Sequence, residues 1–425
     1  MNLTTRVQLS LMMFLQFFVW GAWYGQMSKY MFTQLGATGD QVGNAYTAFS
    51  LAMIIAPFFV GMIADRYFAA EKVLGILNLL GAGVLYFLIQ EKNPDTFFWL
   101  ILAYCITFAP TLALTASIAM QQMTSPEKEF PGIRVLGTIS WIVVTNIVGF
   151  MNVGDKVTIF QLSMFSALAL GVFSFFLPNT PPKQTGGATV SQILGLDAFK
   201  LFKDRSFAIF FLSSVLICIP LSFYYAMANP SLTDSGMTNV ENKMSLGQAS
   251  EVIFMLLIPL AFVRLGVKNM LIVGLIAWIV RFILFGYGDG NTSEWMLYIA
   301  IILHGVCYDF FFVTGMIYTD NKAGEKIKSS AQGLITLATY GIGMGIGSKL
   351  SGLVADMYTG ADGKIDWTSV WMVPAGIAGV VLLLFIFMFT DKQRSGAIDH
   401  TRVDVAFEDV KYEEHSGRAG RKANP

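Results

Sequence analysis

Long apolar runs separated by short polar segments fill the chain from its N-terminus to residue 390. A helix needs about 20 apolar residues to cross a bilayer, and the runs are close to that length or longer. They are Val7–Ser28, Gln41–Ala64, Val73–Gln90, Thr96–Pro126, Val135–Gly154, Val157–Pro182, Ser206–Thr233, Met244–Val263, Asn269–Gly288, Trp295–Thr319, Ser329–Leu350 and Trp367–Thr390. The pattern predicts an all-α integral membrane protein with twelve transmembrane helices.

Composition supports a membrane protein and removes several other classes. Of the 425 residues, 55% are hydrophobic and 13% are charged, against about 25% charged in a soluble domain. The net charge is zero, so nothing indicates nucleic-acid binding. The three cysteines stand singly in apolar runs, and two of the three histidines lie beyond residue 390. These spacings exclude a disulfide framework and a Cys/His metal site, and we expect no cofactor.

The distribution of basic residues predicts the orientation in the membrane. Cytoplasmic loops carry an excess of lysine and arginine. Most of the 28 basic residues fall on the cytoplasmic side if the N-terminus is inside. We therefore expect both termini in the cytoplasm.

The longest internal polar segment divides the chain into two parts. Residues 1–178 and 207–390 each hold six predicted helices, and residues 179–206 form a cytoplasmic linker. Within the linker, Ser191–Lys203 is amphipathic and predicts a short helix at the membrane surface. The polar tail, residues 391–425, has the composition of a disordered segment. Two six-helix halves are typical of transporters built from repeats.

Four ionisable residues interrupt the apolar runs of the second half: Glu251, Arg281, His304 and Asp309. A charge at the bilayer centre costs about 2.5–3.5 kcal/mol or more, so such residues normally meet a partner or a water-filled cavity. Arg281 fits a structural partner for a carboxylate. Gln248 lies three residues before Glu251, hence on the same helix face, and this pair suits a polyhydroxylated, uncharged ligand.

His304 and Asp309 are five residues apart and cannot form one couple on a helix. Five steps of about 100° rotate Asp309 roughly 140° from His304, whereas Tyr308 shares the face of His304. We expect one face to line a cavity and the other to meet a neighbouring helix. A carboxyl group removed from water can exchange a proton near neutral pH, because desolvation disfavours its charged form. Glu251 and Asp309 are therefore candidate proton carriers, and a permanently paired structural charge is the alternative for each.

A polar stripe also marks the cytoplasmic start of the fifth predicted helix. Arg134, Thr138 and Trp141 follow one another at spacings of four and three, which places them on one face. A guanidinium, a hydroxyl and an indole together suit a ligand with a polar sugar and a flat ring. The alternative for Arg134 alone is a topology anchor.

Several segments resemble known transporter sequences. GMIADR, which begins at Gly61, resembles the signature loop of the major facilitator superfamily and contains Asp65 and Arg66. RVLGTISWI, GLDAFKLFKD, GQASEVIF, CYDFFFVTG and SAQGLITL together resemble the bacterial nucleoside:proton symporter family over nearly all of residues 1–390.

The resemblance implies the major facilitator fold and proton-driven nucleoside uptake by alternating access. It also implies a protein of the bacterial inner membrane, which we expect to be a monomer in the lipid bilayer. It implies a substrate and coupling region, with departures from the family pattern at Trp141, His304, Ser222 and Tyr225. The expected substrate-binding residues are Arg134, Thr138, Trp141, Ser222, Tyr225, Gln248, Glu251, His304 and Tyr308. Asp309 and Glu251 are expected to couple protons, and the signature loop to act in conformational change.

Three alternatives to nucleoside transport can be weighed against the sequence. A proton-coupled sugar or polyol carrier could use the same polar residues. An intramembrane enzyme would need a nucleophile with its base or a metal cluster, and the sequence shows neither. A receptor would not need charges spread over three spans.

Overall fold

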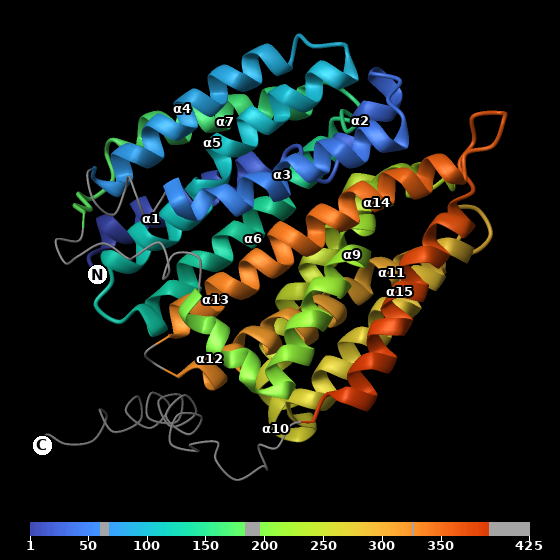
Figure 1. Ribbon diagram of the computed structural model, residues 1–425. Coiled ribbons are helices and arrows are strands. Elements are labelled where there is room, and N and C mark those ends of the chain that lie inside the picture. The colour runs from blue at the N-terminus through green and yellow to red at the C-terminus, as the bar shows by residue number, and fades with distance from the viewer. Residues whose placement is uncertain (60–67, 183–195, 325–326, 391–425) are drawn as a thin grey trace, which may run out of the picture. The chain divides into compact units, whose positions relative to one another are not determined.

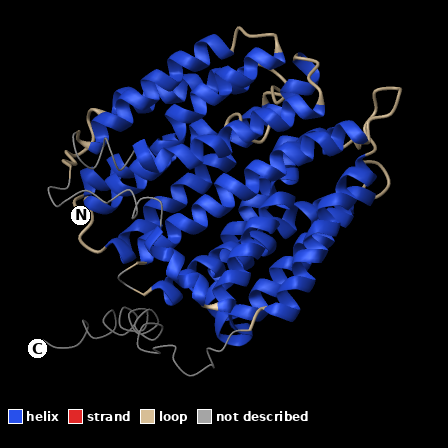
Figure 2. Cartoon of the chain, in the orientation of Figure 1, coloured by secondary structure: helices blue, strands red, loops and turns tan. Residues whose placement is uncertain are grey.

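Helices make up most of the described chain (Figure 2). The computed structural model describes residues 1–59, 68–182, 196–324 and 327–390. Within these residues, Thr359 and Ile365 form an isolated antiparallel β-bridge. Residues Met1–Phe389 form one compact unit. The predicted signature loop residues Gly61, Asp65 and Arg66, and the predicted disordered tail, lie outside the described residues.

The described residues of the first part of the chain form the helices α1 to α7, which are labelled in Figure 1. They are α1 (Leu3–Gly21), α2 (Met27–Gln34), α3 (Gly39–Phe59), α4 (Ala70–Leu88), α5 (Pro94–Gln121), α6 (Pro126–Phe150) and α7 (Thr158–Ser174). The first predicted run is not one helix, because a turn at residues 22–26 separates α1 from α2. Local sequence signals start some of these helices: the Asn93 side chain accepts the N–H groups of Asp95 and Thr96 at the start of α5.

The remaining described chain is also helical. It comprises the 3₁₀ helix η2 (Leu196–Lys203), α9 (Arg205–Asp234), α10 (Val240–Tyr287), α11 (Glu294–Tyr308), the π-helix η3 (Asp309–Val313), α12 (Thr314–Ala323), α13 (Lys328–Thr336), the π-helix η4 (Leu337–Gly343), α14 (Met344–Met357) and α15 (Trp367–Met388). Two predicted runs are joined in α10, which turns at Gly266 with φ 69°. Glycine adopts that positive φ without strain, so one residue replaces the predicted connection.

Apolar length marks seven of the described helical stretches as able to cross a membrane. They are Ala70–Leu88, Pro94–Gln121, Glu129–Phe150, Arg205–Asp234, Val240–Tyr287, Glu294–Ala323 and Trp367–Met388. The linker prediction falls partly outside the described residues, which resume at Leu196. Within η2, Ala198 packs with Ala331 and Leu334 of α13, whereas the Phe199 side chain is 52% exposed.

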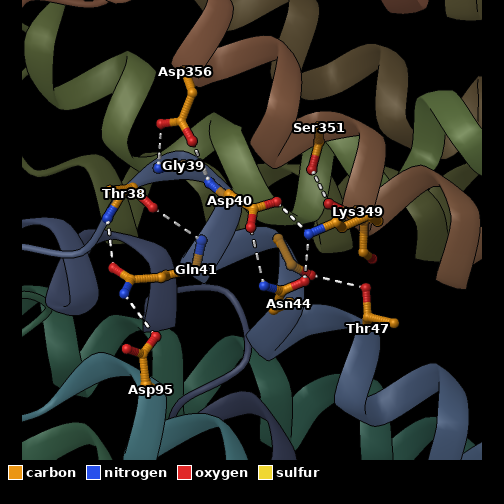
Figure 3. A network of polar contacts seen from close by, with 12 residues as sticks. Thr38, Gly39, Asp40, Gln41, Asn44, Thr47, Asp95, Lys349, Ser351 and Asp356 are labelled. Carbon is orange, nitrogen blue, oxygen red and sulfur yellow. Dashed lines mark hydrogen bonds and ion pairs between the residues drawn. The ribbon is translucent and has the colours of Figure 1, made fainter.

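Packing between the first and second parts of the chain is concentrated on a few helices. Helix α3 packs along α14, and α6 packs against α10. Figure 3 shows the polar contacts where α3 begins. The Asp356 carboxylate of α14 accepts the backbone N–H groups of Gly39 and Asp40 at 2.6 and 2.8 Å. It therefore caps the positive end of α3 from another helix.

Further side-chain contacts surround this cap. Lys349 of α14 forms an ion pair with Asp40 and donates to the Asn44 side-chain oxygen at 2.9 Å. At the neighbouring ends of the bundle, Lys29 pairs with Glu241 at 2.8 Å. We call the contacts of Asp356, Lys349, Asp40 and Lys29–Glu241 the end network.

Candidate substrate site

A cavity lies between helices from both parts of the chain. It contains about 660 Å³ of space free of protein atoms, its open mouth included. Its walls come from α1, α6, α9, α10, α11, η4 and α14. The lining residues are Phe17, Trp20, Tyr24, Arg134, Gly137, Thr138, Trp141, Tyr225, Gln248, Glu251, His304, Tyr308, Tyr340 and Met344.

The predicted substrate residues, with one exception, line this cavity together. The helical stripe on α6 and the Gln248–Glu251 face of α10 both reach it, and so do Tyr225, His304 and Tyr308. Ser222 does not. Its buried hydroxyl donates to the backbone oxygens of Cys218 and Met344 at 2.9 and 3.1 Å, so it stabilises the packing of α9 on α14.

Aromatic side chains form much of the wall, including some that the sequence did not assign to a site. Trp20 meets Trp141 edge to face with ring centroids 5.3 Å apart, and Tyr24 meets Tyr225 at the same distance. Phe17 and Trp20 of α1 and Tyr24 of the following turn are spaced by three and four residues, so this helical spacing was the available signal. Their aromatic character alone fitted a membrane-interface belt equally well.

The polar groups of the cavity come from α6, α10 and α11. The Arg134 guanidinium lies over the Phe17 ring, 4.3 Å from its centroid. The Glu251 carboxylate is 3.8 Å from Nε2 of His304, and its side chain retains 18% exposure. A carboxylate, an amide from Gln248 and an imidazole therefore stand next to the aromatic wall.

A hydrogen bond beside the cavity joins residues at two π-helical segments. The Tyr308 hydroxyl, directly before η3, hydrogen-bonds to the Tyr340 hydroxyl in η4 at 2.8 Å. Short π-helical segments are rare and frequently occur at functional sites. Hydropathy gives no signal for them, so the sequence predicted neither the segments nor the tyrosine pair.

Asp309 is separated from the cavity wall, as its rotation from His304 indicates. It is 0% exposed, and both carboxylate oxygens have no hydrogen-bond partner among the described residues. A charged carboxylate stripped of water and of partners costs several kcal/mol. The protonated acid does not carry that cost, so this position suits a group that holds a proton.

Arg281 does not have the carboxylate partner that the sequence suggested, within the part of the chain that the structure describes. The buried guanidinium instead contacts the Ala300 carbonyl oxygen, His304 and the Tyr224 ring. No group of three or more His, Cys, Asp or Glu side chains that could hold a metal ion occurs in the described residues.

A second hollow adjoins the cavity and contains about 370 Å³ of space free of protein atoms, its open side included. Trp141, Tyr225 and Gln248 line both spaces. On its far side, buried Gln26 and Thr145 present oxygens without partners in the described chain. The three shared side chains therefore separate the two spaces.

Close approach of α11 to α10 sets the distance between His304 and Glu251. The backbone N–H of Gly305 donates to the Ser250 hydroxyl at 3.0 Å. A Cβ at Gly305 would lie 2.6–2.7 Å from backbone atoms of Ser250 and Glu251. These are backbone atoms that cannot turn away, so a side chain here would separate the two helices.

We expect Gly305→Ala to lower the thermal stability of the purified protein and its substrate affinity together. Overpacking of this kind costs about 1–3 kcal/mol. Gly379→Ala is the matched control, because a Cβ there meets nothing within 4 Å. Wild-type melting temperature and affinity in Gly305→Ala would show that this contact does not hold the site.

An all-helical chain with membrane-crossing apolar helices and a polar, aromatic-walled cavity between its two parts has the features of a membrane transporter. The profile of the nucleoside H⁺ symporter family matches residues 1–394. The chain belongs to the nucleoside:proton symporter family. It is a transporter and not an enzyme, and it is a multi-pass protein of the inner membrane.

Individual relatives agree with this assignment over nearly the whole chain. Identity to YegT of Escherichia coli (strain K12) is 38% over 401 residues, covering 91% of this chain and 94% of YegT. Identity to the nucleoside permease NupG of the same organism is 33% over 430 residues, covering 97% and 100%. The crystal structure of the nucleoside transporter NupG superposes with a TM-score of 0.84 at 32% identity, covering 92% of this chain and 100% of that one. The fold is that of a major facilitator transporter.

Proposed function

We propose that this protein takes up nucleosides with protons through the cavity between α6 and α10–α11. The observation that carries the proposal is the pairing of flat aromatic rings, Trp20 and Trp141, with the polar groups of Gln248 and Glu251 in one space. A nucleobase is flat and stacks on aromatic side chains, whereas the ribose offers hydroxyl groups that amides and carboxylates bind.

Particular residues take roles in this proposal. Trp141 supplies the stacking surface, and Gln248, Glu251 and His304 supply hydrogen bonds. Arg134, Thr138, Tyr225 and Tyr308 complete the wall. Ser222 has no contact with substrate, because its hydroxyl is already bonded within the helix packing.

Uptake of labelled uridine or adenosine by cells expressing the protein tests the proposal. When a protonophore removes the proton gradient, uptake should fall from accumulation to equilibration of the nucleoside with the medium. Unlabelled nucleosides should compete, and sucrose and maltose should not. Competition by sugars alone would replace nucleosides with polyols as the substrate, the alternative that the same polar groups permit.

The proton carriers in this proposal are Glu251 and Asp309. Glu251 lies in the cavity wall, where bound substrate would remove the remaining water from its carboxylate. Asp309 is fully enclosed and has no partner in the described chain. A substrate-linked carboxyl group and a deeper carboxyl group together offer a way to tie substrate binding to protonation.

The proposed topology has twelve membrane spans in two halves, 1–178 and 207–390. In this topology α1 and α2 together form one span, and α10 forms two spans that meet at Gly266. The helices from α11 to α12 form one span, and those from α13 to α14 form another. Contacts support the division, because α1 packs with α6 and α7, whereas α9 packs with α14 and α15. We further propose a monomer with both termini in the cytoplasm.

A cysteine placed at Lys203 tests the topology. This residue ends η2 in the linker, and we expect a membrane-impermeant thiol reagent to label it only in inside-out vesicles. A cysteine at Lys364, an exposed residue between α14 and α15, should react only in intact cells. The opposite pattern would reverse the orientation of the whole chain. The three native cysteines are buried and form a low background.

We propose that the end network holds the cavity closed toward the outside and opens during alternating access. In the proposed topology, α3 begins and α14 ends at the outer surface. The capping of α3 by Asp356 exists only while the two helices touch. Opening therefore has to break it. The signature loop around Asp65 remains a predicted counterpart on the cytoplasmic side.

Asp356→Ala should shift the protein toward the state that is open to the outside. Loss of a helix cap costs about 0.5–2 kcal/mol, here only in the closed state. In a Thr145→Cys background, which places a reporter in the second hollow, labelling from outside should rise several-fold. Asp362→Ala, an exposed loop carboxylate, serves as the control. Unchanged labelling would exclude the Asp356 cap from this gate.

A further inference from the structure

Arg281 is a buried cation whose partner is an imidazole instead of a carboxylate. The residue is 0% exposed. Its Nε donates to the Ala300 carbonyl oxygen at 2.8 Å, and its Nη1 lies 3.0 Å from Nδ1 of His304. The guanidinium carbon sits 3.7 Å from the centroid of the Tyr224 ring, a cation–π contact.

The contact fixes the chemistry of the imidazole. A guanidinium group has five N–H donors and no acceptor, so Nδ1 of His304 has to accept the hydrogen bond through its lone pair. The single ring proton then resides on Nε2, and the imidazole is neutral. Protonation at Nδ1 would remove the acceptor and place two cations in contact inside the protein, where their repulsion is poorly screened.

The opposite ring nitrogen faces the substrate cavity. His304 belongs to the cavity lining, and its Nε2 is 3.8 Å from the nearest Glu251 oxygen. That separation is too long for a direct hydrogen bond. The Nε2–H group is therefore free to donate to an acceptor that enters between the two side chains.

We propose that Arg281 is a positioning residue that holds His304 as the neutral Nε2–H tautomer and so makes it a constant hydrogen-bond donor to the substrate. The matching group on a nucleoside is a carbonyl oxygen, ring nitrogen or hydroxyl oxygen. The inference rests on the proposed function for its substrate, whereas the tautomer is a property of the protein alone.

The surroundings of His304 contain no other group that does the work of Arg281. The side chains near it in the described structure are Tyr224 on α9, Glu251 on α10, and Cys307 and Tyr308 on α11. Glu251 alone would attract a proton onto the imidazole. The positive charge of Arg281, on the opposite side of the ring, disfavours protonation of the imidazole. Protonation linked to substrate binding therefore occurs on the Glu251 carboxyl group.

Nitrogen-15 NMR of the full-length protein, labelled at histidine, tests the tautomer without any substrate. His304→Gln identifies the signal by its loss. Wild-type His304 should show a protonated Nε2 and an unprotonated Nδ1 throughout pH 5–8. Arg281→Met should give a mixture of tautomers or titration within that range, and Arg281→Lys should largely restore the wild-type spectrum. A wild-type imidazole that titrates, or that carries its proton on Nδ1, overturns the proposal whether or not nucleosides are transported.

Substrate binding supplies the second measurement. Arg281→Met should weaken nucleoside binding about tenfold, the effect of one lost hydrogen bond, and should add a dependence on pH near 6.5, where a free imidazole titrates. In a His304→Gln background, the amide N–H donates the hydrogen bond and has no proton to lose in this pH range. Arg281→Met should then neither weaken nucleoside binding further nor add a pH dependence. Equal loss of binding in both backgrounds, with an unchanged pH profile, would make Arg281 a structural residue only. Absence of nucleoside binding by the wild type would instead contradict the proposed function.

Discussion

Replacing Glu251 by glutamine is expected to abolish proton-driven accumulation of nucleoside while part of the substrate exchange across the membrane survives. The amide keeps the size and hydrogen-bonding capacity of the side chain but cannot take up a proton. Glu251 is the carboxyl group that lines the cavity, next to Gln248 and 3.8 Å from His304. Its proton occupancy is therefore the one that bound substrate can change directly. Uptake against a gradient and counterflow between equal pools measure the two activities separately.

Asp309→Asn is the companion variant, because Asp309 has no partner in the described chain that would fix its charge. Loss of accumulation with retained counterflow would identify it as a second coupling group. Asp362→Asn, in an exposed loop, should behave as wild type. Wild-type dependence of accumulation on the proton gradient in both Glu251→Gln and Asp309→Asn would exclude the two carboxyl groups from coupling.

Trp141→Ala should produce the largest loss of binding. Stacking of a base on an aromatic side chain is worth about 1–3 kcal/mol, which corresponds to a weakening of roughly 5- to 150-fold. The indole also borders both the cavity and the second hollow, so its removal joins the two spaces. Equilibrium binding of labelled nucleoside to purified protein measures the effect.

The choice of control for Trp141 follows from the packing. Trp99 is 67% exposed, and Trp99→Ala should leave binding unchanged. Trp20 is unsuitable, because it lies in the same wall and touches Trp141 edge to face. Equal affinities of Trp141→Ala and Trp99→Ala would remove Trp141 from the site.

The helical fold followed from hydropathy, because a chain in a bilayer has to satisfy its backbone hydrogen bonds within each segment. The local breaks did not follow. The turn at residues 22–26, the single-residue turn at Gly266 and the π-helical segments η3 and η4 change hydrogen bonding without changing hydropathy. An apolar run indicates that a helix can exist there, and it does not specify how the helix is interrupted.

The side chains around the cavity were predictable where they share one helix and depended on packing where they do not. Thr138 with Trp141, and Gln248 with Glu251, follow from helical spacing. The pairing of Arg281 with His304, 23 residues apart, depends on how α10 and α11 meet. Ser222 was wrongly assigned to the cavity, because its hydroxyl forms its hydrogen bonds with backbone oxygens of the packed helices α9 and α14.

Transport by the purified protein in lipid vesicles tests the central claim most directly. Vesicles with an acidic exterior and labelled nucleoside outside should concentrate the nucleoside inside, and collapse of the pH gradient by a protonophore should reduce the signal to equilibration. Glu251→Gln protein in the same vesicles should equilibrate the nucleoside without concentrating it. Concentration that persists without a pH gradient, or no nucleoside movement at all, would contradict proton-coupled nucleoside transport through this cavity.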